Sequence, residues 1–300
     1  MRKESNHKKR ILGVFLLVFC IGILTGCGMK KNQEHFDLGV AALQAGEEET
    51  AIQEFEKAVS EKGGKKGREL NKNSLRYLGI LSYKKGNMEE AASYLERALA
   101  ITGSDDLNLD ICYYLGEIYE EQEKFNIAVE MYSRVTELEK DKAKLDDVTC
   151  RKLYLQIITG DVTRDEAYQM LEAKAQDGVA GAHYYLGCIL QAEEAYEDAI
   201  EQFEEYLANA GNRSALAYNK MALCYQALEK PEEAYEAVKT GLSQGDETQT
   251  QSLLWNEVAL LEDMARFDEA KAAAEEYLKR YPDDEKMKRE YEFLSSRSGS

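Results

Sequence analysis

Residues 78–98 read LGILSYKKGNMEEAASYLERA, and the architecture of the whole chain depends on the pattern within this segment. Two apolar stretches flank a turn at Lys85-Gly86-Asn87. In each stretch apolar side chains recur three or four residues apart, a spacing that places them on one face of an α-helix. Glycine and asparagine between them are typical turn residues. The segment therefore predicts two amphipathic helices joined by a tight turn.

This pattern recurs along the chain with a period of 32 to 40 residues. Its most regular mark is an alanine in the second helix, found as Ala51, Ala91, Ala128, Ala167, Ala199, Ala234 and Ala270. Twelve residues before the alanine, in the first helix, four of the seven units carry glycine: Gly39, Gly79, Gly116 and Gly187. Glycine inside a helix costs about 1 kcal/mol relative to alanine. Its recurrence at one register predicts a close crossing of the two helices.

Together, Leu78-Gly79, Gly86, Ala91, Leu95 and Ala98 resemble the tetratricopeptide repeat. This unit begins near Lys72, and the other matching units begin near Asn32, Leu109, Ala180, Ala215 and Gln251. The resemblance implies an all-α, right-handed superhelical solenoid of about seven helix pairs over residues 35–294, in which each pair buries its apolar face against its neighbours. The unit at 148–177 has Leu155 in place of the glycine, which predicts a distorted repeat.

A further helix is expected after the last pair. Asp283-Asp284-Glu285 follow Pro282 and place acidic residues at a helix N-terminus, where they complement the helix dipole. Met287, Tyr291 and Leu294 then recur at helical spacing. These residues predict a capping helix for the final repeat. The polar residues 295–300 are expected to form a disordered tail.

The N-terminal residues predict export rather than a folded element. A basic start is followed by an uncharged apolar run, residues 11–24, which is short for a membrane-spanning helix but suits an export signal. The run ends in Leu24-Thr25-Gly26-Cys27, which resembles the lipobox of bacterial lipoproteins. The resemblance implies cleavage of a signal peptide, residues 1–26, and acylation of Cys27. Residues 27–34 would then be a lipidated tether on the extracytoplasmic side of the cell membrane. An uncleaved signal anchor with an ordinary thiol at Cys27 is the alternative.

The net charge of the chain argues against one class of partner. The chain has 56 acidic and 38 basic residues, for a net charge of −18. Cleavage would remove five basic residues and one acidic residue, so the mature chain would carry −22. That balance argues against sequence-independent nucleic-acid binding, which needs a basic face.

The remaining cysteines, Cys112, Cys150, Cys188 and Cys224, form no CxxC pair. Buried thiols are favoured over disulfides, and no metal or cofactor site is predicted.

No catalytic motif stands out. Nucleophile elbows, HExxH, GxGxxG and EF-hand loops are missing, and the glutamate clusters are of the kind that cover solvated helix faces.

In the tetratricopeptide family the first helices of successive repeats line a groove that holds peptides or partner helices. The resemblance implies the following groove residues: Arg76, Tyr83, Tyr113, Glu117, Tyr184, Gln191, Asn219, Gln226, Trp255 and Glu262. Packing between neighbouring repeats is the alternative role for Tyr113, Tyr184 and Trp255.

The sequence as a whole predicts a membrane-anchored lipoprotein that acts as a non-catalytic scaffold for proteins or peptides of the bacterial cell envelope. Its acidic body favours partners with basic patches. The alternative function is a receptor for solutes or cell-wall fragments, associated with a transporter or an envelope assembly complex. The family's lysine and asparagine clamp is absent from the first unit, where Phe36 and Val40 stand, so partners of the chaperone-tail type are not expected.

Overall fold

The computed structural model describes residues 27–60, 65–208 and 214–297, and all its regular elements in these ranges are α-helices. The predicted signal peptide, residues 1–26, lies outside the described residues, as do residues 298–300 of the predicted tail. None of the described helices is both long and apolar enough to cross a membrane. The chain divides into two compact units, one ending at Ile118 and the other beginning at Tyr119.

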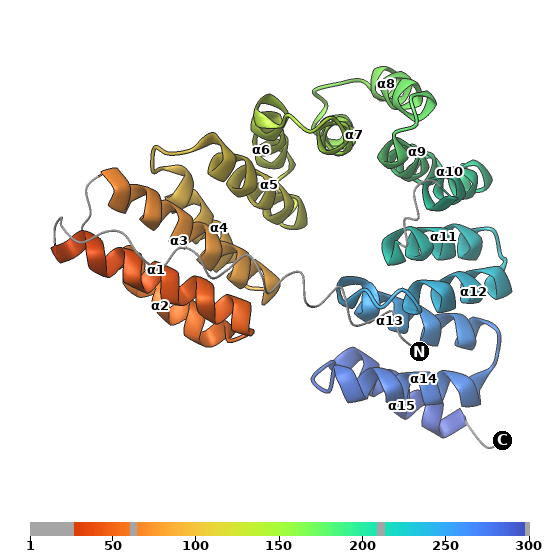
Figure 1. Cartoon of the computed structure of the whole chain (residues 1–300). Helices are drawn as coiled ribbons and strands as arrows, with labels where there is room; N and C mark the ends of the chain where they lie inside the picture. The colour runs from red at the N-terminus through yellow and green to blue at the C-terminus, as the bar shows by residue number, and fades with distance from the viewer. Residues whose placement is uncertain (1–26, 61–64, 209–213, 298–300) are drawn as a thin grey trace, which may run out of the picture. The chain divides into compact units, whose positions relative to one another are not determined.

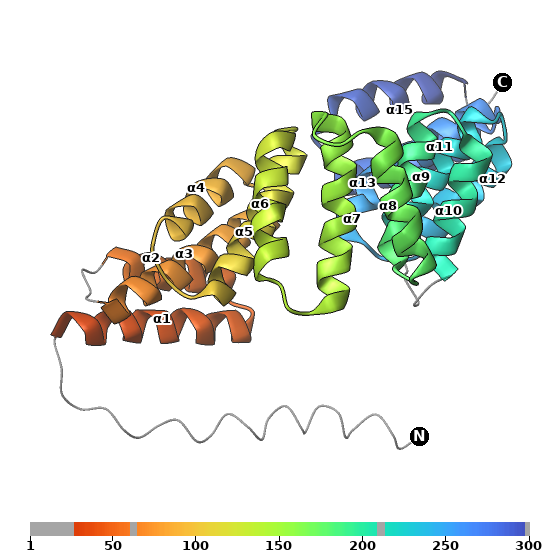
Figure 2. The same cartoon turned by 90° about the horizontal axis from the view of Figure 1, so that it is seen from above.

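Helices of the N-terminal unit follow one another in antiparallel pairs (Figures 1 and 2). They are α1 (Cys27–Ala45), α2 (Glu48–Ser60), α3 (Lys65–Lys84), α4 (Met88–Leu99) and α5 (Asp105–Glu121), the last of which continues into the second unit. Two pairs, α1–α2 and α3–α4, pack closely, and α3 also contacts α1 and α2. Helix α1 already includes residues 27–34, the stretch expected to be a tether. Asn32 within it is fully buried, because α3 packs over this part of α1.

The C-terminal unit continues the pattern with ten helices that follow the end of α5. They are α6 (Phe125–Leu138), α7 (Lys142–Thr159), α8 (Arg164–Gln176), α9 (Ala180–Ala192), α10 (Tyr196–Ala208), α11 (Ala215–Ala227), α12 (Pro231–Leu242), α13 (Glu247–Asp263), α14 (Phe267–Arg280) and α15 (Glu285–Arg297). Successive helices contact one another throughout this unit. The prediction of an all-α repeat of helix pairs is confirmed.

The glycines of the repeat lie where paired helices cross. A Cβ atom added at Gly79 would lie 2.5 Å from Leu95 Cγ, and one added at Gly187 would lie 2.7 Å from Phe203 Cε1. Real Cβ atoms do not approach other heavy atoms so closely, so these crossings need glycine. Residues 142–176 also form a helix pair, α7–α8, although both Leu155 and Leu171 are buried there. The fourth unit thus keeps the helix pair without the glycine.

The predicted capping helix is α15, and its apolar face covers the final pair. Met287 and Leu294 are fully buried and join a cluster with Leu261, Ala274 and Tyr277. Asp284 caps the helix by accepting hydrogen bonds from the backbone N–H groups of Lys286, at 2.9 Å, and Met287, at 3.1 Å. A side-chain oxygen in this position satisfies N–H groups that have no partner inside the helix.

Candidate partner-binding site

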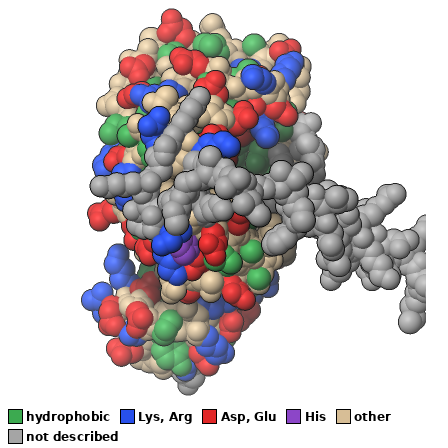
Figure 3. All heavy atoms as spheres, turned by 60° about the vertical axis from the view of Figure 1, so that its left-hand side comes forward, with side chains coloured by type: hydrophobic (Ala, Val, Ile, Leu, Met, Phe, Trp, Pro, Cys, Tyr) green, Lys and Arg blue, Asp and Glu red, His purple; other side chains and the backbone are tan. Residues whose placement is uncertain are grey.

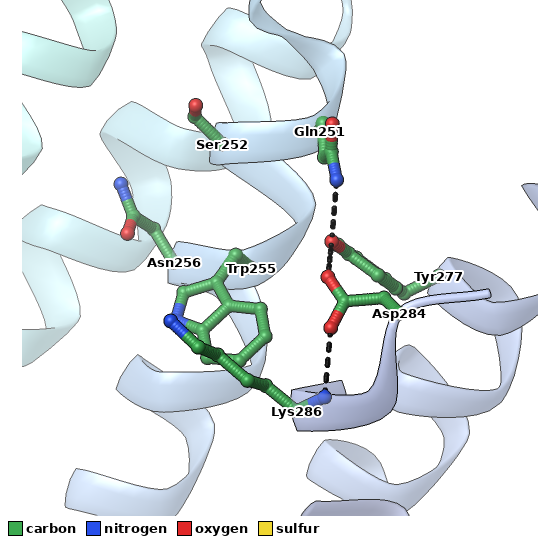
Figure 4. A pocket seen from close by; sticks show the side chains of 7 residues that line it. All are labelled: Gln251, Ser252, Trp255, Asn256, Tyr277, Asp284 and Lys286. Atoms are coloured by element: carbon green, nitrogen blue, oxygen red, sulfur yellow. Dashed lines mark hydrogen bonds between the residues drawn. The ribbon is translucent and has the colours of Figure 1, made fainter. Parts of the chain in front are cut away.

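An open pocket of about 340 Å³ lies where the last three helices of the C-terminal unit meet. Figure 4 shows its seven lining residues: Gln251, Ser252, Trp255 and Asn256 on α13, Tyr277 on α14, and Asp284 and Lys286 at the start of α15. The residues of α13 are one to five positions apart, so they occupy one side of that helix. We call this site the Trp255 pocket.

A chain of hydrogen bonds holds one wall of the Trp255 pocket in place (Figure 4). Gln251 Nε2 donates to the Tyr277 hydroxyl at 2.9 Å, and that hydroxyl donates to Asp284 Oδ2 at 2.6 Å. The bond from Tyr277 holds the pKa of the Asp284 carboxyl below its ordinary value, whereas burial raises the pKa of Tyr277. Both oxygens of Asp284 have partners within the protein, so this carboxylate stabilises the wall and is not free for a ligand.

Other groups of the pocket remain available. The half-buried Trp255 ring stands edge-on to Tyr277, with 6.0 Å between ring centroids. Ser252 and Lys286 are exposed, and within the described residues the Lys286 ammonium forms no ion pair. Asn256 Nδ2 donates to Asn219 Oδ1 at 2.6 Å, which leaves its own carbonyl oxygen as an acceptor. An aromatic surface edged by hydroxyl, ammonium and amide groups can bind a peptide segment, and nothing in this set activates a nucleophile.

In the N-terminal unit, the predicted groove residues of α3 and α5 lie close to one another. Arg76 donates to Asp110 Oδ2 at 2.5 Å, and its guanidinium lies 4.5 Å from the centre of the Tyr77 ring. The rings of Tyr83 and Tyr113 both contact Tyr114, at 5.8 and 6.1 Å between centroids. Glu117 is half-buried on the same helix as Tyr113, and burial, followed by the charge of Glu117, raises the pKa of Tyr114. The side chains of this cluster contact one another, so they contribute to the packing of α3 against α5.

In the C-terminal unit, Tyr184 and Gln191 are mainly packing residues. The Tyr184 ring contacts Phe203 and Tyr206, and burial raises its pKa far above the ordinary value. Gln191 Nε2 donates to the backbone oxygen of Lys220 and to Cys224 Sγ. The alternative role of packing therefore describes Tyr184 better than the groove. Of this set, Trp255 lines a pocket, and Asn219 supports it through Asn256.

Two residues predicted for the groove lie at or near the C-terminal end of α13 and do not line the Trp255 pocket. Gln226 is exposed and donates to Asp263 Oδ2 at 3.0 Å. Glu262 precedes that aspartate on α13 and is half-buried. Ser252, Tyr277 and Lys286 were not singled out by the sequence. Asn256 could have been found from its place beside Trp255, but no sequence signal connects Lys286 on the capping helix with α13.

The Glu262 carboxyl on α13 and the Glu290 carboxyl on α15 are close enough to affect each other's ionisation. Glu262 Oε1 is buried and has no hydrogen-bond partner. Burial, and then Glu290 and Asp263, raise the pKa of Glu262 to about 7, whereas Arg297 opposes the rise. Because two nearby carboxylates repel each other, protonation of Glu262 lowers the repulsion between α13 and α15.

We expect the attachment of α15 to weaken as the pH rises. Because the folded pKa of Glu262 exceeds the ordinary value of 4.5, its protonation stabilises the fold fully below that value, and this contribution is lost as the pH rises through about 7. Amide hydrogen exchange, corrected for its intrinsic pH dependence, should show α15 protection falling from about pH 5 to about pH 8. Glu262→Gln should flatten this profile, while Glu292→Gln, an exposed change on α15, should not. A flat wild-type profile would contradict the role of the pair.

The cysteines offer no competing site. Cys112, Cys150, Cys188 and Cys224 are buried and form no disulfide among the described residues, and burial raises the pKa of Cys150 to about 12. In the described part of the chain, no cluster of histidine, cysteine, aspartate and glutamate could hold a metal ion. On the face that Figure 3 shows, hydrophobic side chains occur in small separate groups between acidic and basic ones.

Comparison with known proteins identifies the repeat. Two family models, each described as the tetratricopeptide repeat, match residues 78–105 and 109–142 in one case and 258–284 in the other. A solved tetratricopeptide repeat protein from Parabacteroides merdae is similar in structure, with a TM-score of 0.64 and 14% identity over 89% of this chain and 99% of that chain. The Cut9–Hcn1 hetero-tetramer of the APC/C matches with a TM-score of 0.55 and 11% identity, over 89% of this chain and 47% of that one. No curated protein matches the sequence. These findings confirm that the chain contains tetratricopeptide repeats.

Proposed function

We propose that this protein is a non-catalytic scaffold that binds a protein or peptide partner at the Trp255 pocket. The observation that carries the proposal is the pocket itself. It presents the chain's only tryptophan, half-buried, beside three groups that have no partner among the described residues: the Ser252 hydroxyl, the Asn256 carbonyl oxygen and the Lys286 ammonium. Tryptophan contributes large binding energies at protein interfaces because a rigid ring buries much area at little entropic cost. The tetratricopeptide repeats support a role in protein–protein interaction.

The cellular location of the protein is part of the same proposal. The lipobox-like Leu24-Thr25-Gly26-Cys27 and the apolar run before it support a lipoprotein anchored through Cys27, with its body in the bacterial cell envelope. The net charge of −18 supports partners with basic patches, because opposite charges speed association and exclude unsuitable partners.

Photo-crosslinking in cells that produce the full chain tests the scaffold. A photoreactive residue at Ser252, which is exposed and lines the pocket, should give a discrete protein adduct. Trp255→Ala should abolish the adduct while leaving the level of the protein unchanged. The same probe at Glu201, an exposed position on α10, is the matched control and should give none.

The outcomes separate the two parts of the proposal. Adducts that are absent at Ser252, or that persist after Trp255→Ala, would refute partner binding at this pocket. In the same cells, Cys27→Ser should release the protein from the membrane fraction. Retention of that variant in the membrane would contradict the lipid anchor but not the scaffold.

A further inference from the structure

A second pocket, of about 370 Å³, lies between α11 and α12. Helix α11 contributes Tyr218, Met221 and Tyr225, and α12 contributes Glu232, Glu233, Glu236, Ala237 and Thr240. The two tyrosines are seven residues apart, so they share one face of α11. The first two glutamates belong to the first turn of α12, and Glu236 lies one turn further on. We call this site the tyrosine–glutamate pocket.

The negative charge of this pocket is not neutralised by the protein. Among the described residues, none of the three lining carboxylates has an ion-pair partner. Two nearby cations lie against Tyr235 instead. Lys239 Nζ, on α12 itself, lies 5.7 Å from the centre of that ring, and the Arg266 guanidinium, which also pairs with Glu269, lies 4.9 Å from it. Burial, together with the charges of Glu204 and Glu233, raises the pKa of Tyr225. The pocket therefore combines aromatic rings with carboxylates that lack a counter-charge.

The fold uses this combination elsewhere and fills it with an arginine. The Arg164 guanidinium lies 4.4 Å from the centre of the Tyr168 ring and donates to both oxygens of Glu193, each at 2.5 Å. A planar guanidinium can stack on an aromatic ring while its edge bonds to a carboxylate, whereas an ammonium group acts as a point charge. The tyrosine–glutamate pocket has the ring and the carboxylates of this arrangement but no guanidinium.

A metal ion does not fit the pocket as well. Within the described residues, the glutamates of α12 are not grouped closely enough to form a metal site. Hard cations such as Ca²⁺ need several oxygen ligands around one point. Three carboxylates spread along a helix opposite two phenol rings suit an extended organic cation better.

We propose that the tyrosine–glutamate pocket binds an arginine side chain of the protein partner. The inference rests on the proposed function, because it specifies the chemistry of a second contact with the same partner. Tyr218 and Tyr225 supply the aromatic surface, and Glu233 and Glu236 accept hydrogen bonds from the guanidinium. The pocket thereby selects partners by a basic side chain, in addition to whatever segment occupies the Trp255 pocket.

Residue-resolved NMR with two small probes tests the proposal on the full chain. The probes are N-acetyl-arginine amide and N-acetyl-citrulline amide, which have nearly the same shape but differ in charge. The arginine probe should shift the backbone resonances of α11 and α12 in a saturable way, and the citrulline probe should not. Equal shifts from both probes, or arginine-induced shifts confined to other helices, would overturn the assignment.

Variants identify which side chains bind the arginine probe. Glu233→Gln with Glu236→Gln should weaken binding of the arginine probe by about tenfold or more, because both acceptors lose their charge. Glu47→Gln with Glu48→Gln changes the net charge equally at exposed positions of another repeat and should leave binding unaltered. Tyr225→Leu keeps the carboxylates but removes a ring, and it should also weaken binding. Unchanged binding in the double glutamine variant, or equal loss in its control, would refute the pocket.

Failure of this inference can be told apart from failure of the proposed function. The small probes need no partner, and the Ser252 crosslink needs no arginine pocket. If the wild-type protein does not bind the arginine probe but still gives Ser252 adducts, only the assignment of the tyrosine–glutamate pocket would be refuted. Arginine binding without Ser252 adducts would support this pocket while refuting partner binding at the Trp255 pocket.

Discussion

Phe203→Ala is expected to lower the free energy of unfolding of the C-terminal unit by about 3–5 kcal/mol. The Phe203 ring is fully buried, and it fills the space that Gly187 leaves open on α9. It also contacts the Tyr184 ring, with 5.8 Å between centroids. Truncation leaves a cavity that rigid helices cannot close, so the lost transfer energy and the cavity both add to the cost.

Urea unfolding followed by circular dichroism measures this effect. Glu201→Ala, an exposed change on the same helix, is the control and should alter stability by less than about 0.5 kcal/mol. Phe203→Leu should give an intermediate loss, because it keeps part of the buried volume. A Phe203→Ala variant as stable as the control would show that the α9–α10 crossing does not depend on this ring.

Gly79→Ala is expected to destabilise the N-terminal unit by about 1–3 kcal/mol, although alanine is the better helix former. The added Cβ would lie 2.5 Å from Leu95 Cγ and 3.2 Å from the carbonyl oxygen of Ala91. Neither neighbour can move freely, since Leu95 is fully buried and the carbonyl belongs to the backbone of α4. Overpacking should therefore outweigh the gain in helix propensity of about 1 kcal/mol.

A second glycine in α3 provides the control for that substitution. At Gly67 an added Cβ would meet only Asn32 Nδ2, at an ordinary contact distance of 3.9 Å. Gly67→Ala should therefore leave stability unchanged or raise it slightly. Similar losses at both positions would mean that loss of the glycine itself, rather than the close crossing, is responsible.

The helix pairs could be predicted because the sequence repeats their packing. In most units, a residue on the first helix faces a residue sixteen positions later on the second helix. Where one side chain of such a pair is small, the other is larger, so the total volume at the crossing stays similar. The pairs are Gly39 and Phe55, Gly79 and Leu95, Gly187 and Phe203, Ala222 and Val238, and Val258 and Ala274. The one unit that breaks this rule, with Leu155 and Leu171, still forms its helix pair. Local amphipathic spacing is thus enough for a pair, and the small residue sets how closely its helices approach.

The candidate sites were less predictable, because side-chain roles depend on neighbours from other repeats. Tyr184 and Trp255 look alike in the sequence as aromatic residues on first helices. Both rings are half-buried, but the structure packs Tyr184 against Phe203 and Tyr206, whereas Trp255 lines a pocket. The difference arises from the element that follows: α15 places Asp284 and Lys286 beside α13. No periodicity within α13 reports what the capping helix contributes.

The sequence by itself determined the repeat, the helix pairs, the capping helix and the overall acidity, because each is local or periodic and follows from side-chain spacing along a helix. Only the tertiary structure decided which polar groups are already paired and which remain available. It engages Arg76 with Asp110 but leaves Glu233 and Glu236 without a cation beside two tyrosine rings. Such pairing depends on distances between helices that lie far apart in the chain, and spacing within one helix carries no information about them.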